Sequence, residues 1–153
     1  MASLSIGKPA PDFTFSSAQG ERSFSSFDGH NRILYFYPKD DTPGCTAEAC
    51  SFRDNYASLT KKGFTIVGVS PDNEAKHEKF KTKHELPFQL IPDTDHSIAE
   101  AYGVWGLKKF MGREYMGILR TTFVINEKGI ITHVIEKVDT KDASRQLLAV
   151  TNS

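Results

Sequence analysis

The chain contains two cysteines, Cys45 and Cys50, in the segment 42–50, Thr-Pro-Gly-Cys-Thr-Ala-Glu-Ala-Cys. A strand-like run precedes this segment, and residues 45–62 have helical composition. Unpaired backbone N–H groups and the helix dipole stabilise a thiolate at a helix N-terminus. A second thiol nearby, off the same helical face, suggests redox chemistry that involves a conformational change.

The helix is expected to begin at Thr42, whose hydroxyl can cap it. Pro43 suits the first helical position because it has no N–H to leave unpaired. Gly44 admits close approach of another group, and Cys45 then lies in the first turn, where backbone donors are free.

Helical periodicity places the two cysteines on different faces. Residues within about 40° of Cys45, at 100° per residue, form an apolar stripe. The stripe consists of Ala49, Phe52, Tyr56 and Leu59. Cys50 lies about 140° from Cys45, on the side of Asp54, Ala57 and Lys61. We therefore expect Cys45 to face inward and Cys50 to face outward.

The five-residue spacing also limits disulfide formation. On a regular helix the two Cα atoms would be roughly 8.5–9 Å apart. A disulfide requires about 4.4–6.8 Å. A bond between Cys45 and Cys50 thus requires the first turns of the helix to unwind.

Two other interpretations of the cysteines compete with redox chemistry. Free cysteines are commonly inert, buried hydrophobic residues. Zinc usually needs four ligands, often in close pairs. The histidines are scattered away from the cysteines, at His30, His77, His84, His96 and His133. We expect no metal site, and we expect His77 and His84 to be solvated on a charged helix.

The surrounding segments predict a mixed β-sheet. Residues 33–37 and 64–70 are continuous β-prone runs, as expected of strands covered on both faces. The helical segment between them implies a right-handed parallel crossover. Further expected elements are a hairpin from 11–15 and 22–25, helices at 72–85, 95–102 and 142–150, and a hairpin from 121–125 and 130–135.

These elements together predict a thioredoxin-like α/β fold. Its central mixed sheet would have helices on both faces and an N-terminal β-hairpin. The chain has 153 residues without repeats or linkers, so we expect a single domain, 1–153, that needs no disulfide to hold its core.

The composition limits which classes of partner the protein could bind and which cell compartment it could occupy. The 19 basic and 19 acidic residues balance, which argues against nucleic-acid and membrane partners. The longest apolar runs are far too short for a membrane span. Two cysteines without a visible signal peptide predict a reducing, cytoplasmic location, while a removed organelle transit peptide stays open.

At these residues the chain resembles the peroxiredoxins, and within them the bacterioferritin comigratory protein/PrxQ subfamily. The family pattern Pro-x-x-x-Thr/Ser-x-x-Cys matches Pro38, Thr42 and Cys45, and the subfamily's resolving cysteine matches Cys50. The similarity extends over the segments 7–13, 101–106, 112–118 and 120–124.

The resemblance implies a thiol-dependent peroxidase that acts in antioxidant defence without haem, metal or another cofactor. Cys45 would be the peroxidatic nucleophile, which becomes a sulfenic acid on reducing hydrogen peroxide or an organic hydroperoxide. Cys50 would then form an intrachain disulfide with Cys45. Thioredoxin or a similar dithiol would reduce that disulfide, and the protein is expected to be a monomer.

The resemblance also implies roles around the nucleophile. Thr42 would orient the peroxide, and Pro38 and Pro43 would shield the pocket from water. Backbone N–H groups around Gly44 would polarise the O–O bond. Arg120 would stabilise the thiolate and the developing charge on oxygen.

Four further residues have less defined roles. Glu48 either supports the site or simply favours the N-terminal end of the helix dipole. Arg113 is expected to be structural or to lie at the pocket rim. Tyr102 and Trp105 are expected to anchor the core or a loop, or to line substrate access.

Two rival functions belong to other classes. A thioredoxin-like dithiol oxidoreductase would normally carry Cys-x-x-Cys, and the four residues between Cys45 and Cys50 argue against it. A noncatalytic binding module on the same fold would leave both cysteines unreactive toward peroxide.

Overall fold

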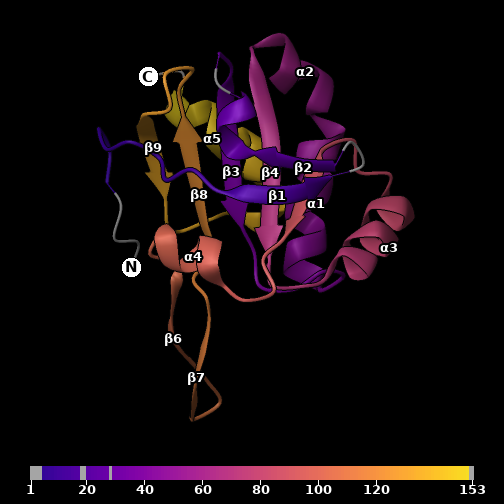
Figure 1. Cartoon of the computed structure of the whole chain (residues 1–153). Coiled ribbons are helices and arrows are strands. Elements are labelled where there is room, and N and C mark those ends of the chain that lie inside the picture. The colour runs from indigo at the N-terminus through magenta and orange to yellow at the C-terminus, as the bar shows by residue number, and fades with distance from the viewer. Residues whose placement is uncertain (1–4, 18–19, 28, 152–153) are drawn as a thin grey trace.

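A five-stranded mixed sheet forms the centre of the computed structural model, which describes residues 5–17, 20–27 and 29–151 (Figure 1). The strand order is β5-β4-β3-β8-β9. β3, β4 and β5 are parallel, β8 is antiparallel to β3, and β9 is antiparallel to β8. The strands are β3 (Asn31–Phe36), β4 (Phe64–Ser70), β5 (Gln89–Pro92), β8 (Thr121–Ile125) and β9 (Ile131–Ile135).

Helices pack around this sheet, and two hairpins form separate two-stranded sheets. The α-helices are α1 (Pro43–Asp54), α2 (Tyr56–Lys61), α3 (Glu74–His84), α4 (Ser97–Ala101) and α5 (Ala143–Thr151). Two short 3₁₀ helices are η1 (Phe24–Phe27) and η2 (Thr140–Asp142). One hairpin pairs β1 (Thr14–Ser17) with β2 (Gly20–Ser23), and the other pairs β6 (Trp105–Phe110) with β7 (Arg113–Ile118). The thioredoxin-like fold predicted from the sequence is confirmed.

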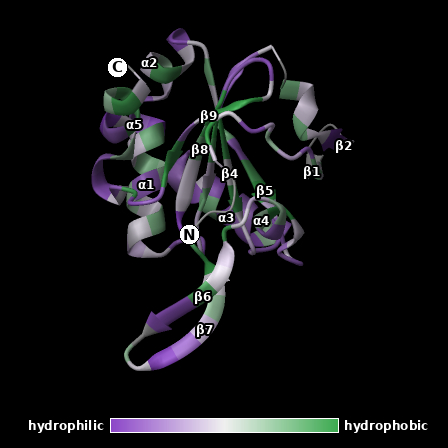
Figure 2. Ribbon diagram, turned by 90° about the vertical axis from the view of Figure 1, so that its left-hand side faces the viewer, coloured by the Kyte–Doolittle hydropathy of each residue, from purple (hydrophilic) through white to green (hydrophobic). Residues whose placement is uncertain are grey.

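The alternation of side chains along β3 divides the core into two layers. Ile33 and Tyr35 join a buried cluster with residues of α1, α2, α3 and α5. Leu34 and Phe36 point to the opposite face, where β1, η1 and α4 complete a second cluster. Figure 2 shows α1, α2 and α5 on one side of the sheet and the β1–β2 hairpin on the other. Because both faces are covered, β3 is apolar from Ile33 to Phe36, although it begins with Asn31 and Arg32.

A glycine in β4 makes room for a tyrosine in the layer that contains α1. Gly68 pairs with Tyr35 across the parallel strands. A Cβ atom at Gly68 would lie 2.8 Å from Cζ of Tyr35 and 2.9 Å from Cδ2 of Leu90. Only a residue without a side chain leaves this space, so Gly68 allows the Tyr35 ring to pack beneath α1.

The expected helix over 45–62 differs from the structure in one respect. It ends at Asp54, and α2 begins at Tyr56 after Asn55. Asn55 has ψ 14°, outside the usual helical region. The stripe nevertheless continues, because Leu59 is buried beside Cys45, Ala49 and Phe52.

The sequence analysis missed β5 and the β6–β7 hairpin. This hairpin projects beyond the sheet, next to α4 (Figure 1). Its turn residues, Met111 and Gly112, both have positive φ, at 52° and 80°. Such a two-residue turn is usually marked by Asn-Gly or Asp-Gly, so Met-Gly provides a weak signal. By contrast, Gly129 (φ 83°) occupies the predicted turn before β9.

None of the helices in the described ranges is long and apolar enough to cross a membrane.

Candidate active site

Cys45 lies in the first turn of α1, as the sequence predicts. Thr42 is the N-cap residue with an extended backbone, Pro43 follows at the first position, and the amide of Thr46 donates to the Thr42 carbonyl at 2.8 Å. The expected cap through the Thr42 side chain is wrong, since its hydroxyl donates to the carbonyl of Lys39 at 2.9 Å. The N–H groups of Gly44 and Cys45 precede the first intrahelical bond and point out of the helix start.

The two thiols have the predicted difference in exposure. Cys45 is 1% exposed and packs in the layer beneath the sheet with Ala49 and Phe52. Cys50 is partly exposed, and both cysteines are free thiols. α1 runs without a break past both residues. The premise that a disulfide would require unwinding therefore holds in this conformation.

Arg120 brings a positive charge to the Cys45 sulfur. It lies in the short connection between β7 and β8, and its Nη2 donates to Sγ of Cys45 at 3.2 Å. Its Nη1 donates to Oε1 of Glu48 at 2.7 Å. A Cβ atom at Gly44 would lie 3.4 Å from Nη2, an ordinary van der Waals distance, which shows how closely the guanidinium lies against the helix start. The site thus presents a fixed cation to the sulfur.

The electrostatics of Arg120 reflect these partners. Burial alone would lower its pKa, but the nearby Cys45 and Glu48 raise the pKa above its ordinary value. The guanidinium therefore keeps its charge within the site.

Glu48 is an acidic group behind the thiol. Its side chain is 0% exposed and forms an ion pair with Arg120. Burial raises the pKa of Glu48 to about 7, although Arg120 acts to lower it. Its Oε2 atom has no hydrogen-bond partner among the described residues. Of the two roles left open by the sequence, support of the site is the one that this geometry favours.

The segment that leads into α1 is anchored by a buried network. The Tyr37 hydroxyl donates to Oδ1 of Asp40 at 2.6 Å. Nδ1 of His77 lies 2.6 Å from Oδ2 of Asp40, and Nε2 lies 3.1 Å from the carbonyl oxygen of Ile91. The prediction that His77 is solvated is wrong, since it is 3% exposed. Its helix is highly charged, but the His77 ring contacts Asp40 of the segment between β3 and α1 and is buried there.

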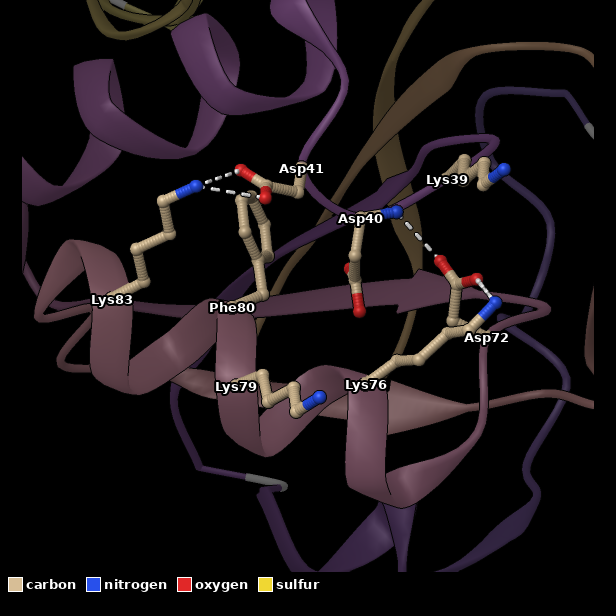
Figure 3. A pocket seen from close by; sticks show the side chains of 8 residues that line it. All are labelled: Lys39, Asp40, Asp41, Asp72, Lys76, Lys79, Phe80 and Lys83. Carbon is tan, nitrogen blue, oxygen red and sulfur yellow. Dashed lines mark hydrogen bonds and ion pairs between the residues drawn. The ribbon is translucent and has the colours of Figure 1, made fainter.

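A cavity of about 460 Å³ lies beside this anchored segment (Figure 3). Across it, the Asp40 amide donates to Oδ2 of Asp72 at 2.6 Å, and Lys83 forms an ion pair with Asp41 at 2.9 Å. Cys45 is not among its lining residues. These contacts hold the segment against α3 and the end of β4. Nε2 of His84 lies 3.4 Å from Oδ1 of Asp41, and the His84 side chain is partly buried rather than fully solvated.

The remaining predicted residues lie at different depths. Pro38 is half-buried, whereas Pro43 is exposed at the helix start. Tyr102 is fully buried and its hydroxyl donates to the Pro11 carbonyl at 2.6 Å, as expected of a core anchor. Trp105 stacks on the ring of His96, with 3.7 Å between centroids.

Arg113, expected to be structural or to lie at the pocket rim, is on the projecting hairpin. It is exposed at the first residue of β7, next to the hairpin turn. Within the described part of the chain it forms no hydrogen bond or ion pair with the Cys45 site.

No group of three or more His, Cys, Asp or Glu side chains in the described ranges could hold a metal ion. At Cys45, a thiol lies next to the guanidinium of Arg120 and at the N-terminus of α1. Such an arrangement stabilises a thiolate and negative charge on an attacked oxygen.

Comparison with known proteins points to the same chemistry. The AhpC/TSA family model matches residues 6–134. The chain is 50% identical over 140 residues to Peroxiredoxin Bcp of Bacillus subtilis, covering 91% of this chain and 89% of that protein. It is 42% identical over 143 residues to Peroxiredoxin Bcp of Escherichia coli, covering 93% and 92%.

A solved structure is similar over nearly the whole length. The bacterioferritin comigratory protein of Xanthomonas campestris superposes with a TM-score of 0.88 at 29% identity. The match covers 98% of this chain and 97% of that one. That structure concerns alkyl peroxide reduction by the Xanthomonas protein.

Proposed function

Because the chain belongs to the AhpC/TSA family, as a peroxiredoxin of the bacterioferritin comigratory protein/PrxQ group, we propose that Cys45 is the residue that attacks peroxide. Members of this family are thiol peroxidases. The observation that carries the assignment is the hydrogen bond of 3.2 Å from Arg120 to the sulfur of Cys45. Cys50 interacts electrostatically with Arg53, whose guanidinium donates instead to Asp54 and to the carbonyl of His84.

The first step forms a sulfenic acid. The Cys45 thiolate attacks one oxygen of hydrogen peroxide or an organic hydroperoxide, the S–O bond forms, and the O–O bond breaks. The departing hydroxide or alkoxide takes a proton and leaves as water or alcohol. Arg120 and the free N–H groups of Gly44 and Cys45 stabilise the charge that develops on oxygen. We assign to Thr42 the orientation of the peroxide, and to Pro38 and Pro43 the shielding of the pocket from water.

The second step joins the two cysteines. The Cys50 thiolate attacks the sulfur of the sulfenic acid, the S–S bond forms, and the oxygen leaves as water. The start of α1 must unwind to bring the sulfur atoms together. Oxidation of Cys45 supports that movement, since a neutral sulfenic acid no longer offers Arg120 a negative partner.

The contacts of α1 indicate which part opens. Next to Cys50, the Ser51 side chain accepts from the Ser144 amide at 3.1 Å, and its carbonyl accepts from the Ser144 hydroxyl at 2.8 Å. The start of the helix has no side-chain cap. We therefore assign the opening to the turn that carries Cys45, while Ser51 remains bound to α5.

An external dithiol such as thioredoxin completes the cycle. Its thiolate attacks the more exposed sulfur, that of Cys50, and its second thiol releases the reduced protein while the reductant becomes a disulfide. The intrachain disulfide needs no second copy of the chain, so the active form is a monomer. A reducing compartment such as the cytoplasm supplies the electrons. Size-exclusion chromatography with light scattering of the reduced protein tests the monomer, and a stable dimer would contradict it.

Mass spectrometry after one equivalent of peroxide tests the central proposal. The expected product has lost the mass of two hydrogens, and digestion links the Cys45 and Cys50 peptides. Unchanged thiols would refute a peroxidase role and favour a binding module. A sulfenic acid on Cys45 that never forms the disulfide would retain the first step but overturn the role of Cys50.

Amide exchange tests the unwinding independently. Residues 42–50 should exchange faster in the disulfide form than in the reduced form, because their helical hydrogen bonds are lost. The segment of α1 beyond Ser51 serves as the internal control and should change less. An identical exchange pattern in the two redox forms would contradict the local opening.

A further inference from the structure

Asp41 lies at the boundary between the anchored segment and the turn of α1 that carries Cys45. Its backbone has φ 60°, in the left-handed region that residues other than glycine occupy at a cost. Thr42 follows in an extended conformation, and Pro43 begins the helix. Because the chain changes conformation at each of these residues, the direction in which α1 starts depends on the backbone torsions of Asp41.

Asp40, one residue earlier, is a fixed point of the chain. Its side chain is buried, and the Tyr37 hydroxyl and a ring nitrogen of His77 each lie 2.6 Å from one of its carboxylate oxygens. Its amide donates to Asp72 at 2.6 Å. Buried hydrogen bonds to a charged group are costly to break. The reactive turn therefore lies between two bound positions, Asp40 before it and Ser51 after it.

Asp41 is held by an exposed contact with α3. Nζ of Lys83 donates to both carboxylate oxygens of Asp41, at 3.2 and 2.9 Å (Figure 3), and Nε2 of His84 lies 3.4 Å from Oδ1. The side chains of Asp41 and Lys83 are 51% and 60% exposed. An exposed ion pair of this kind is weak, so it can break while the buried contacts of Asp40 persist.

Two bound positions with one breakable contact between them define a moving segment. We propose that Asp41 is the hinge of the local opening and that its ion pair with Lys83 is a latch, which keeps Cys45 beside Arg120 and opposes its movement toward Cys50. When the ion pair breaks, the backbone torsions of Asp41 are free to change. Residues 42–50 can then leave the helix while Asp40 and Ser51 stay bound.

The latch would also set the lifetime of the sulfenic acid on Cys45. While the turn is closed, this group can react with a second hydrogen peroxide, in which a new S–O bond forms, the O–O bond breaks, and sulfinic acid and water result. Opening instead brings Cys50 to the sulfur and gives the disulfide. A tighter latch thus slows the disulfide and favours overoxidation.

This inference deepens the proposed function and depends on the Cys45–Cys50 disulfide for its catalytic consequence. The test compares Lys83→Gln with Lys79→Gln. Lys79 belongs to the same helix and lines the same cavity, but it forms no hydrogen bond or ion pair with the residues that the structure describes. Asp41→Asn removes the other charge of the pair and keeps a residue that tolerates the left-handed region. Lys83→Arg retains the positive charge.

The first readout is amide exchange of residues 46–50 in the reduced protein, which requires no peroxide. Their helical hydrogen bonds begin with the one from the Thr46 amide to the Thr42 carbonyl, and opening breaks them. Lys83→Gln and Asp41→Asn should each raise the exchange rate about two- to fourfold, as expected for loss of an exposed ion pair. The double variant should show no further increase, because both changes remove the same interaction.

The controls separate charge from packing. Lys79→Gln and Lys83→Arg should exchange as the wild type does. Raising the salt concentration to about 0.5 M should speed exchange in the wild type and leave Lys83→Gln almost unchanged, because salt screens exposed ion pairs. Thermal unfolding of all variants reports any loss of structure.

The second readout is the rate of disulfide formation after one equivalent of hydrogen peroxide, followed by acid quenching and mass spectrometry. This rate should rise in Lys83→Gln and Asp41→Asn by the same factor as the exchange rate. Both variants should also accumulate less sulfinic acid on Cys45 in excess peroxide, because the disulfide forms sooner.

Equal exchange rates in Lys83→Gln and Lys79→Gln would overturn the latch, whether or not the protein consumes peroxide. Additive effects of Asp41→Asn and Lys83→Gln would also overturn it, because the two side chains would then act separately. Faster exchange that Lys83→Arg restores, in a protein that never forms the disulfide, would support the latch and refute the proposed role of Cys50 instead.

Discussion

Within α1, the turn that carries Cys45 and the turn that carries Cys50 differ in burial, in charge and in their attachment to the rest of the molecule. Cys45 is 1% exposed and accepts a hydrogen bond from Arg120, while Cys50 is partly exposed. The chain before Cys45 is anchored through Asp40 and His77, whereas the chain after Cys50 is bound to α5 through Ser51.

This contrast shows that position on a helix is not enough to define a reactive cysteine. Both thiols belong to one uninterrupted helix of 12 residues. What separates them is the set of groups that other elements bring to each one. The side that holds Cys45 supplies a cation and excludes water, and the side that holds Cys50 leaves its sulfur open to a reductant.

Replacing Cys45 tests the contrast most severely. Cys45→Ser should reduce peroxide consumption by roughly a thousandfold or more, because a serine hydroxyl is a far weaker nucleophile than a thiolate. The measurement is the rate of hydrogen peroxide loss in the presence of excess dithiol. The matched control is Cys50→Ser in a single turnover of the reduced protein without reductant, where its first reaction with peroxide should be preserved. A rate for Cys45→Ser near that of the wild type would show that Cys45 is not the thiol that reacts with peroxide.

Cys50→Ser should separate the two steps. The rate of the first reaction with peroxide should stay within about threefold of the wild type, because Arg120 and the helix start are unchanged. Turnover supported by thioredoxin should fall strongly, and dimedone should trap sulfenic acid on Cys45. If Cys50→Ser kept full turnover and no oxidised Cys45 could be trapped, Cys50 would not be the resolving cysteine.

Arg120→Met should remove the cation from the Cys45 side alone. We expect the second-order rate with peroxide to fall about a hundredfold, in the range seen when a donor to a developing oxyanion is lost. Stopped-flow measurement on the reduced protein gives this rate. Arg113→Met is the matched control, because that arginine is exposed near the hairpin turn, and it should behave as the wild type. Equal rates for both variants would contradict the role of Arg120.

Glu48→Gln should change the pH dependence of stability. Burial raises the pKa of Glu48 from 4.5 to about 7, so at intermediate pH the folded protein binds a proton that the unfolded chain has released. Its contribution is thus most favourable below pH 4.5 and is lost as the pH rises through 7. Between pH 5 and 8 the wild type should lose about 2 kcal/mol of unfolding free energy relative to the variant.

Urea unfolding of the reduced proteins at these two pH values measures that difference. Glu114→Gln, an exposed carboxylate on β7, is the control and should follow the wild type. A Glu48→Gln curve parallel to that of the wild type would show that Glu48 ionises in the folded state as it does in water.

Much of the fold was predictable because it depends on local patterns. β3, β4 and the β8–β9 hairpin are marked by apolar runs and by Gly129. The helix expected at 72–85 is α3, which begins after Asn73, whose side chain accepts from the Lys76 amide. The β6–β7 hairpin was missed, because its Met-Gly turn and mixed side chains provide neither a strong turn signal nor a buried face.

The sequence alone determined that Cys45 begins a helix, that it faces inward and that Cys50 does not, since these properties depend on neighbours within a few turns. It also contained the family pattern that singled out Arg120. Only the tertiary structure decided which groups meet at the sulfur. Arg120 is 75 residues from Cys45 along the chain, and His77 is 37 residues from Asp40. Periodicity records which face of an element is buried, but contacts between distant elements depend on how those faces pack together.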